Sequence, residues 1–150
     1  MNIYLAEYED LETVFKISQT TISKVYPNYY PTGAVEFFLS HHNKENILND
    51  ISERNVYILK SDNIIVGTVT INNNEINRLF VLPEYQHRGF GKALLDFAEN
   101  EILKRFNSVR LSASFPAKKI YLKRGYKDWE FDMIRTENGD FLCYDTMIME

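Results

Sequence analysis

The sequence has only one cysteine, Cys143, among its 150 residues, so no disulfide can form within the chain. Proteins of oxidising compartments commonly rely on disulfides, and a chain without them is more typical of the cytoplasm. Nothing near Cys143 in the sequence resembles a base that would activate the thiol. A buried thiol in a strand is therefore the better interpretation than an acyl carrier.

Long apolar runs are missing as well. No stretch approaches the roughly 18 consecutive apolar residues of a membrane-spanning helix. The first ten residues, MNIYLAEYED, lack the basic and apolar segments of a secretory signal. We therefore expect a cytoplasmic protein that has no membrane partner.

An excess of positive charge is also absent. Lysine and arginine number 17 against 21 aspartates and glutamates, which gives a net charge of −4. This balance argues against nucleic acid as a partner and is compatible with cationic substrates. The length predicts one domain over residues 1–150, because no linker, repeat or low-complexity segment divides the chain.

Histidine is scarce, and two of the three histidines are the adjacent His41 and His42. Adjacent positions on a helix point about 100° apart, unlike the i, i+4 pair of a zinc-binding helix. We therefore expect no metal. One histidine should be packed, and the other should be exposed or line an acceptor site.

Strand-like and helix-like patterns alternate along the chain. Strands are predicted over 3–8, 56–59, 64–71, 75–81, 109–113, 126–133 and 141–149. Helices are predicted after Asp10, from Thr32, over 43–51, up to about residue 106, and over 117–124. The segment from Glu75 to Phe106 is predicted to form a strand, a tight turn and a long helix. We expect the rest of the chain to be arranged around it.

The turn in that segment reads Gln86-His87-Arg88-Gly89-Phe90-Gly91-Lys92-Ala93. Glycine allows a tight turn or a close approach to a ligand, and the N–H groups that open a helix have no partner within it. Such a turn can hold a phosphate group, and Arg88 and Lys92 add positive charge. A structural turn with incidental glycines is the alternative interpretation.

Two well-known phosphate-binding motifs do not fit this turn. A Walker A loop needs four residues between its glycines, followed by Lys-Ser/Thr, and a dinucleotide fingerprint needs a third glycine where Leu94 stands. The pattern Q-x-R-G-x-G-x-A instead resembles the pyrophosphate-binding motif of the GNAT superfamily, the acyl-CoA-dependent N-acetyltransferases. The order of predicted elements is also similar to that family over nearly the whole chain.

The resemblance implies a mixed α+β fold. It implies a single, mostly antiparallel sheet of six to seven strands, with a splayed parallel pair at its centre and about four flanking helices. Acetyl-CoA would be the acyl donor, with its pantetheine arm between the parallel strands. The implied cofactor-binding residues are Leu79, Phe80 and Val81 through their backbone, and Gln86, His87, Arg88, Gly89, Phe90, Gly91 and Lys92.

The segment from Ala117 to Tyr126 is similar to the family pattern A-x-x-x-Y-x-x-x-G-[FY]. By this resemblance Tyr121 would protonate the departing thiolate, and a phenol is a suitable donor to a thiolate whose pKa is about 8.5. A tyrosine that only packs its ring is the alternative. Where the family often has asparagine seven residues earlier, this chain has Ser114, whose shorter hydroxyl would contact the cofactor instead.

Glu75 lies eleven residues before Gln86, the offset at which some family members have a basic glutamate. Strand alternation places Glu75, Asn77, Leu79 and Val81 on one face of the sheet. Glu75, directly or through water, would then accept the amine proton, and Asn77 would help to hold the amine. A solvated carboxylate beside a turn is the alternative.

Three tyrosines fall where the family builds its acceptor pocket: Tyr26, Tyr29 and Tyr30. Aromatic faces suit a cationic or aromatic amine, although ordinary packing of a loop explains them equally well. The expected activity is transfer of an acetyl group to a primary amine of a small molecule. The alternatives are a non-catalytic acyl-CoA sensor and a protein or peptide acetyltransferase, and an edge strand near the C-terminus leaves a homodimer open.

Overall fold

Seven strands form a single mixed sheet in the order β1-β2-β3-β4-β5-β7-β6. The computed structural model describes residues 1–150. The strands are β1 (Asn2–Leu5), β2 (Val56–Ser61), β3 (Ile64–Asn72), β4 (Glu75–Val81), β5 (Val109–Ala113), β6 (Lys127–Arg135) and β7 (Phe141–Met149). The helices are α1 (Leu11–Val25), α2 (Thr32–His41), α3 (Lys44–Ser52), α4 (Phe90–Leu103) and α5 (Phe115–Arg124). The expected fold class is confirmed.

The sheet is flanked by five α-helices, which are the five that the sequence patterns predicted, whereas the resemblance implied about four. The helical segment that begins at Thr32 stops at His41, and Asn43 begins a new helix. The side-chain oxygen of Asn43 accepts a hydrogen bond from the Asn46 N–H at 2.8 Å, which caps α3. The sequence predicted a helix over 43–51, and this cap explains why α3 begins as a separate helix after α2.

The first strand is shorter than expected and ends at Leu5. The carboxylate of Asp10 accepts a hydrogen bond from the Glu7 N–H at 2.8 Å, and residues Tyr8–Asp10 form a 3₁₀ turn. Asp10 still precedes α1, but its side chain makes no cap bond to that helix. The turn over Tyr8–Asp10 therefore follows a strand that ends earlier than the predicted residue 8.

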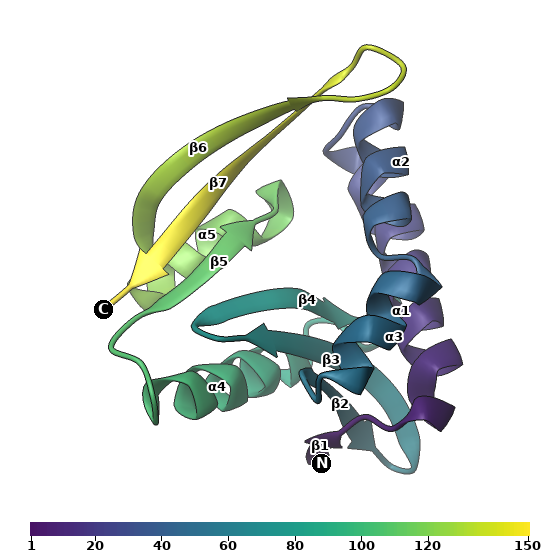
Figure 1. Ribbon diagram of the computed structural model, residues 1–150, viewed down its shortest axis with the longest axis vertical. Coiled ribbons are helices and arrows are strands. Elements are labelled where there is room, and N and C mark those ends of the chain that lie inside the picture. The colour runs from purple at the N-terminus through teal and green to yellow at the C-terminus, as the bar shows by residue number, and fades with distance from the viewer.

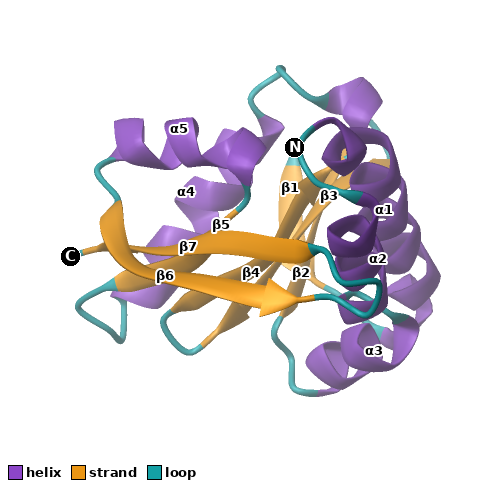
Figure 2. Ribbon diagram, turned by 90° about the horizontal axis from the view of Figure 1, so that it is seen from above, coloured by secondary structure: helices purple, strands orange, loops and turns teal.

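Helices cover both faces of the sheet (Figure 2). Helix α4 packs its apolar side on one face, where the largest core cluster also includes Tyr121 of α5. Helices α1, α2 and α3 cover the other face and bury Ile17, Ile22, Ile47 and Ile51. None of the helices combines the length and the apolar character that crossing a bilayer demands.

The parallel strands β4 and β5 pair at only two positions. Glu75 lies opposite Arg110 and Ile76 lies opposite Leu111, and no pairing follows. Beyond these positions the strands diverge (Figure 1). The edge of β4 that faces β5 therefore has no strand partner after Ile76. This agrees with the splayed parallel strands that the resemblance to the GNAT superfamily implied.

Strand β4 contains a bulge at Arg78. Asn77 lies opposite Thr70 and Phe80 lies opposite Thr68, so two residues of β4 face one residue of β3. Arg78 has a φ of 48°, which is uncommon for a residue with a side chain. Bulges of this kind often re-aim a side chain beside a functional site.

The bulge also changes which side chains share a face. Val81 lies opposite Gly67, and a Cβ on Gly67 would meet Leu94 of α4. Val81 and Leu79 therefore pack in the cluster beneath α4. The prediction that they share a face with Glu75 and Asn77 was wrong, because simple alternation assumes a strand without a bulge.

Candidate active site

A tight turn joins β4 to α4. It begins with a 3₁₀ turn over Pro83–Tyr85, and two of the residues that follow adopt left-handed backbone angles, His87 with a φ of 63° and Gly89 with a φ of 89°. A residue other than glycine is rarely held in this region without a structural or functional reason. The turn therefore keeps an unusual backbone shape at the start of α4.

Six consecutive backbone N–H groups in this turn, from His87 to Lys92, have no hydrogen-bond acceptor within the chain. The first bond into α4 is made by Ala93, whose N–H donates to the Gly89 carbonyl at 3.0 Å. Successive free N–H groups at a helix start attract anions, and the helix dipole adds to this attraction. A backbone arranged in this way can accept a phosphate or diphosphate group.

Gln86 differs from the residues that follow it. Its N–H donates to the Pro83 carbonyl at 3.2 Å, and its side-chain nitrogen donates to the Val81 carbonyl at 2.9 Å. These groups are already bonded, so the free amides begin at His87. Gln86 therefore fixes the turn to the end of β4 through one N–H of its side-chain amide, and the second N–H of that amide makes no bond in the chain.

The two glycines leave the approach to the turn open. No atom lies within 4 Å of a Cβ built on Gly89, and the nearest atom to one on Gly91 is Val81 Cγ2 at 3.9 Å. The guanidinium of Arg88 lies 5.3 Å from the centre of the Tyr85 ring, and Lys92 Nζ bonds Asp96 at 2.8 Å. Two exposed cations therefore flank the open turn.

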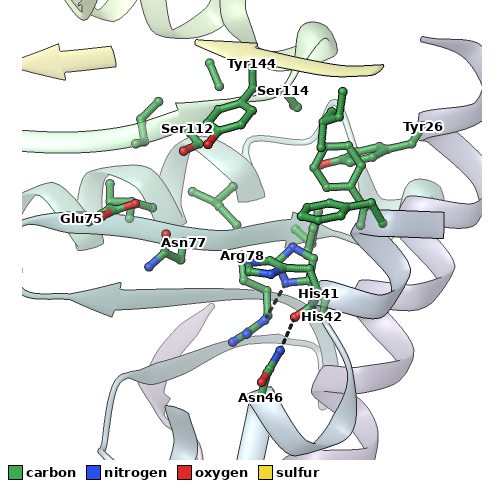
Figure 3. Close-up of a pocket in the computed structure, with 18 of the residues that line it drawn as sticks. Tyr26, His41, His42, Asn46, Glu75, Asn77, Arg78, Ser112, Ser114 and Tyr144 are labelled. Atoms are coloured by element: carbon green, nitrogen blue, oxygen red, sulfur yellow. Dashed lines mark hydrogen bonds between the residues drawn. The ribbon is translucent and has the colours of Figure 1, made fainter. Parts of the chain in front are cut away.

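A cavity of about 570 Å³ lies where β4 and β5 diverge (Figure 3). Seven of the residues predicted from the sequence line it: Tyr26, Glu75, Asn77, Leu79, Phe80, Ser114 and Tyr121. Residues that the sequence did not single out also line it, among them Asp50, Arg78, Ser112 and Tyr144. The cavity thus joins the predicted catalytic groups to side chains from α2, α3 and β7.

Tyr121 is 9% exposed and reaches this cavity from α5. Its ring packs against that of Tyr126, with the centres 5.7 Å apart, and its hydroxyl has no hydrogen-bond partner in the chain. Burial raises the pKa of Tyr121 to about 12, although the nearby Arg124 acts in the opposite direction. The phenol is therefore protonated at neutral pH, and its raised pKa makes it a weaker acid than an ordinary tyrosine.

Ion pairs hold α5 at both ends. Arg124 bonds Asp96 at 2.7 Å and also pairs with the buried Glu99, both on α4. Near the other end of α5, Lys118 bonds Asp145 of β7 at 2.6 Å. These contacts fix the helix that carries Tyr121 against two neighbouring elements.

Of the three predicted acceptor-site tyrosines, only Tyr26 lines the cavity. Tyr29 is half exposed. The Tyr30 hydroxyl accepts a hydrogen bond from the Phe115 N–H at 2.8 Å, and the two rings stack with centres 4.8 Å apart. Tyr30 thus fixes the start of α5, and Tyr29 lies away from the cavity, because the loop turns its aromatic side chains in different directions.

Glu75 and Asn77 line the cavity from the start of β4. The Glu75 carboxylate lies 3.4 Å from Arg110 Nη2, and about a third of its side chain is exposed. It is therefore accessible to a ligand as well as close to a cation. The other predicted residue of β4, Val81, is buried, and its carbonyl accepts from Gln86 and lies 3.4 Å from Thr21 Oγ1.

Arg78 was not singled out from the sequence. It is 8% exposed and bonds three side chains: Nη1 lies 2.9 Å from Asp50 Oδ2 and 3.0 Å from Thr70 Oγ1, and Nε donates to His42 Nδ1 at 3.1 Å. A charged residue in the middle of a predicted strand, directly before the apolar run from Leu79 to Val81, was the available signal. As expected, one of the adjacent histidines is packed, His42, and the other, His41, is exposed.

The buried His42 makes stability depend on pH. Burial lowers the pKa of His42 from 6.5 to about 3, and the neighbouring Arg78 acts in the same direction. Between these values the unfolded chain binds a proton that the folded chain does not. Stability should therefore fall as the pH is lowered through this window, by at most about 1.4 kcal/mol per pH unit from this group.

A comparison with His42→Gln checks this expectation, because the glutamine oxygen can accept the Arg78 bond without titrating. Urea unfolding at several pH values between about 6.5 and about 4 gives the dependence. The variant should lose less stability than the wild type over that range. Equal slopes for the two proteins would show that His42 is not the titrating group.

Known proteins resemble the chain in sequence. The family model "Acetyltransferase (GNAT) domain" matches residues 25–139. The spermidine N(1)-acetyltransferase of Thermoplasma acidophilum is 30% identical over 156 aligned residues, which cover 89% of each chain.

Two solved structures also resemble the chain. The PaiA N-acetyltransferase of T. acidophilum, solved with coenzyme A, has a TM-score of 0.72 at 26% identity and covers 99% of this chain and 98% of its own. A GCN5-related N-acetyltransferase from Rhodopseudomonas palustris has a TM-score of 0.90 at 22% identity, covering 99% and 94%, and shows the same fold.

Proposed function

Because the chain belongs to the GNAT acetyltransferase family and is an acetyl-CoA-dependent acyltransferase, we propose that it acetylates a primary amine of a small molecule. The acetyl group passes directly to the amine within a ternary complex. The whole of residues 1–150 forms one catalytic domain, and the single cysteine favours a cytoplasmic location. The observation that carries the proposal is the combination of a turn with free backbone amides and a cavity that Tyr121 lines.

The cofactor site fits coenzyme A through the chemistry of its donors. The unpaired N–H groups from His87 to Lys92 suit the diphosphate, and Arg88 and Lys92 supply positive charge beside it. A carboxylate or a neutral group would leave most of these six donors without partners. A diphosphate offers several oxygens at once and is the better match.

The pantetheine arm would lie along the free edge of β4. The Leu82 N–H donates to the Val66 carbonyl of β3 at 2.9 Å, so by strand alternation the polar groups of Val81 point away from β3. Because Gln86 already bonds the Val81 carbonyl, the Val81 N–H is the group left to pair with an amide of the arm. Ser114 contributes its hydroxyl from across the cavity.

The bound thioester supplies the acetyl group and leaves as a thiolate. Tyr121 donates its phenolic proton to the leaving sulphur. An alkylammonium has a pKa of about 10, so the attacking amine must first lose a proton. Glu75, directly or through a water molecule, accepts it, while Asn77 and Tyr26 position the amine.

Thiol release measured across a panel of amines tests the proposal. With acetyl-CoA present, we expect amine-dependent thiol release and a product whose mass has increased by one acetyl group. A protein that binds acetyl-CoA but releases no thiol with any amine would be a sensor instead. Acetylation of peptides but of no small amine would contradict the choice of acceptor. The relative that acetylates spermidine makes polyamines an obvious part of the panel.

A further inference from the structure

The end of the cavity beside α3 contains hydrogen-bond donors that have no acceptor. Arg78 is more than nine-tenths buried, and its Nε and Nη1 are bonded to His42, Thr70 and Asp50. The third nitrogen of the guanidinium, Nη2, makes no hydrogen bond in the chain. It is not fully enclosed by protein atoms. Since Arg78 lines the cavity, this nitrogen is available to a ligand there.

His42 adds a second donor at the same place. Its Nδ1 accepts the hydrogen bond from Arg78 Nε, so in the neutral ring the proton is on Nε2. Burial lowers the pKa of His42 to about 3, which keeps the ring neutral at physiological pH. Nε2 has no partner in the chain, and His42 lines the cavity (Figure 3).

Asp50 holds the guanidinium in place without using all of its donors. The salt bridge from Asp50 Oδ2 to Arg78 Nη1 measures 2.9 Å, and the hydrogen bond to Thr70 fixes the same nitrogen. The remaining nitrogen, Nη2, is left unbonded at the cavity. A ligand oxygen is the natural partner, and a carboxylate is the anion that arginine recognises most readily in a small amine.

The start of β4 carries a hydrogen-bond acceptor, whereas Arg78 further along the strand supplies donors. Glu75 lies three residues before Arg78, and its carboxylate is accessible from the cavity. Three residues of a strand span roughly 10 Å, and the bulge at Arg78 changes this only locally. One cavity therefore offers an acceptor for an ammonium group and, along the same strand, donors for an oxygen anion.

We propose that the acceptor is an amine that also carries a carboxylate, which binds Arg78 Nη2 and His42 Nε2. The inference rests on the proposed function and refines its acceptor. The carboxylate is that of a free amino acid or of an acidic or C-terminal residue in a peptide, and both sources supply the same group. Arg78 is then a specificity-determining residue that selects the acceptor and takes no part in the transfer of the acetyl group.

Matched amines test this directly in the wild-type protein. Glycine, 4-aminobutanoate and 6-aminohexanoate are compared with methylamine, propylamine and pentylamine, which lack the carboxylate, and with the diamines of corresponding length. α-Amino acids, and peptides whose only primary amine is a lysine next to a free C-terminus, separate the two sources. The measured quantity is kcat/KM from thiol release.

For at least one matched pair, the amine with the carboxylate should be preferred by roughly tenfold to a hundredfold, the equivalent of one charge-assisted hydrogen bond. Equal or better use of the monoamines, or a preference for diamines, would overturn the inference and leave the proposed function intact. The absence of thiol release with every amine would instead contradict the proposed function, and this inference with it.

Two substitutions locate the effect at Arg78. In Arg78→Met, KM for the preferred amino acid should rise tenfold or more, while KM for its monoamine stays within about twofold. Arg54→Met is the control, because Arg54 also has a left-handed backbone, with a φ of 61°, but is exposed and lies outside the cavity. If Arg78→Met unfolds, Arg78→Lys keeps the charge and should retain part of the preference. An unchanged preference in a folded Arg78 variant would overturn the assignment.

Discussion

Replacing Tyr121 with phenylalanine is expected to lower kcat by well over tenfold and to leave the affinity for coenzyme A within about twofold. General acid catalysis contributes roughly 10²–10⁴-fold in enzymes, so loss of the proposed proton donor should lower kcat strongly. The Tyr121 hydroxyl has no hydrogen-bond partner in the chain, and its removal should therefore leave the stability nearly unchanged. Steady-state thiol release and calorimetric titration with coenzyme A separate the two effects.

The pH dependence of kcat gives a second test of Tyr121. Its pKa is raised to about 12, so the protonated form persists well above the pH at which an ordinary tyrosine ionises. The activity should therefore show no loss from ionisation of this phenol between about pH 7 and about pH 10. A fall in kcat through that range that disappears in Tyr121→Phe would contradict the assigned environment.

Tyr144→Phe is the matched comparison, because Tyr144 lines the same cavity from β7. If phenolic groups in the cavity matter only for packing, the two variants should behave alike. A large loss of kcat in Tyr144→Phe together with normal turnover in Tyr121→Phe would transfer the donor role to Tyr144. We expect the large loss in Tyr121→Phe alone.

Replacing Gly89 with valine should lower the affinity for coenzyme A by roughly a hundredfold or more. Gly89 has a φ of 89°, a conformation that valine adopts poorly, and a side chain at this position would project into open space beside the free amides. Loss of two charge-assisted hydrogen bonds to the diphosphate would cost about 3–6 kcal/mol. Calorimetric titration with coenzyme A gives the affinity.

Gly139→Val controls for backbone strain. Gly139 lies between β6 and β7 with the same φ of 89°, and the position that a Cβ would occupy there is 3.9 Å from its nearest neighbour, Arg135 Nη2. Both variants should lose about 1–2 kcal/mol of stability, because left-handed backbone is unfavourable for a residue with a Cβ. Only Gly89→Val should lose cofactor affinity. Equal affinities in the two variants would remove the turn from the cofactor site.

Local features of the fold could be predicted because nearby residues determine them. Asn43 caps α3 through a bond to Asn46, three residues away. Gly125 follows the predicted helix over 117–124 and ends α5 with a left-handed φ of 103°, a conformation that glycine adopts readily. The turn at Gly89 is likewise encoded in one short segment, which is why both the motif and its shape could be read from the sequence.

Contacts between distant segments could not be predicted. Arg78 is placed by a bulge and held by Asp50 and His42, which belong to a much earlier part of the chain. Tyr30 bonds the start of α5 across 85 residues. Sequence periodicity does not reveal such contacts, so the cluster of Arg78, His42 and Asp50 could be found only in the structure. The turn at the start of α4, in contrast, could be predicted from a motif.

Amide NMR spectra recorded during titration with coenzyme A test the central claim most directly. The backbone amides of residues 87–92 should shift strongly with coenzyme A but not with pantetheine, which lacks the diphosphate, because those six N–H groups have no other acceptor. If coenzyme A binds while these resonances stay where they are, or if pantetheine moves them equally, the diphosphate is held elsewhere and the account of the site is wrong.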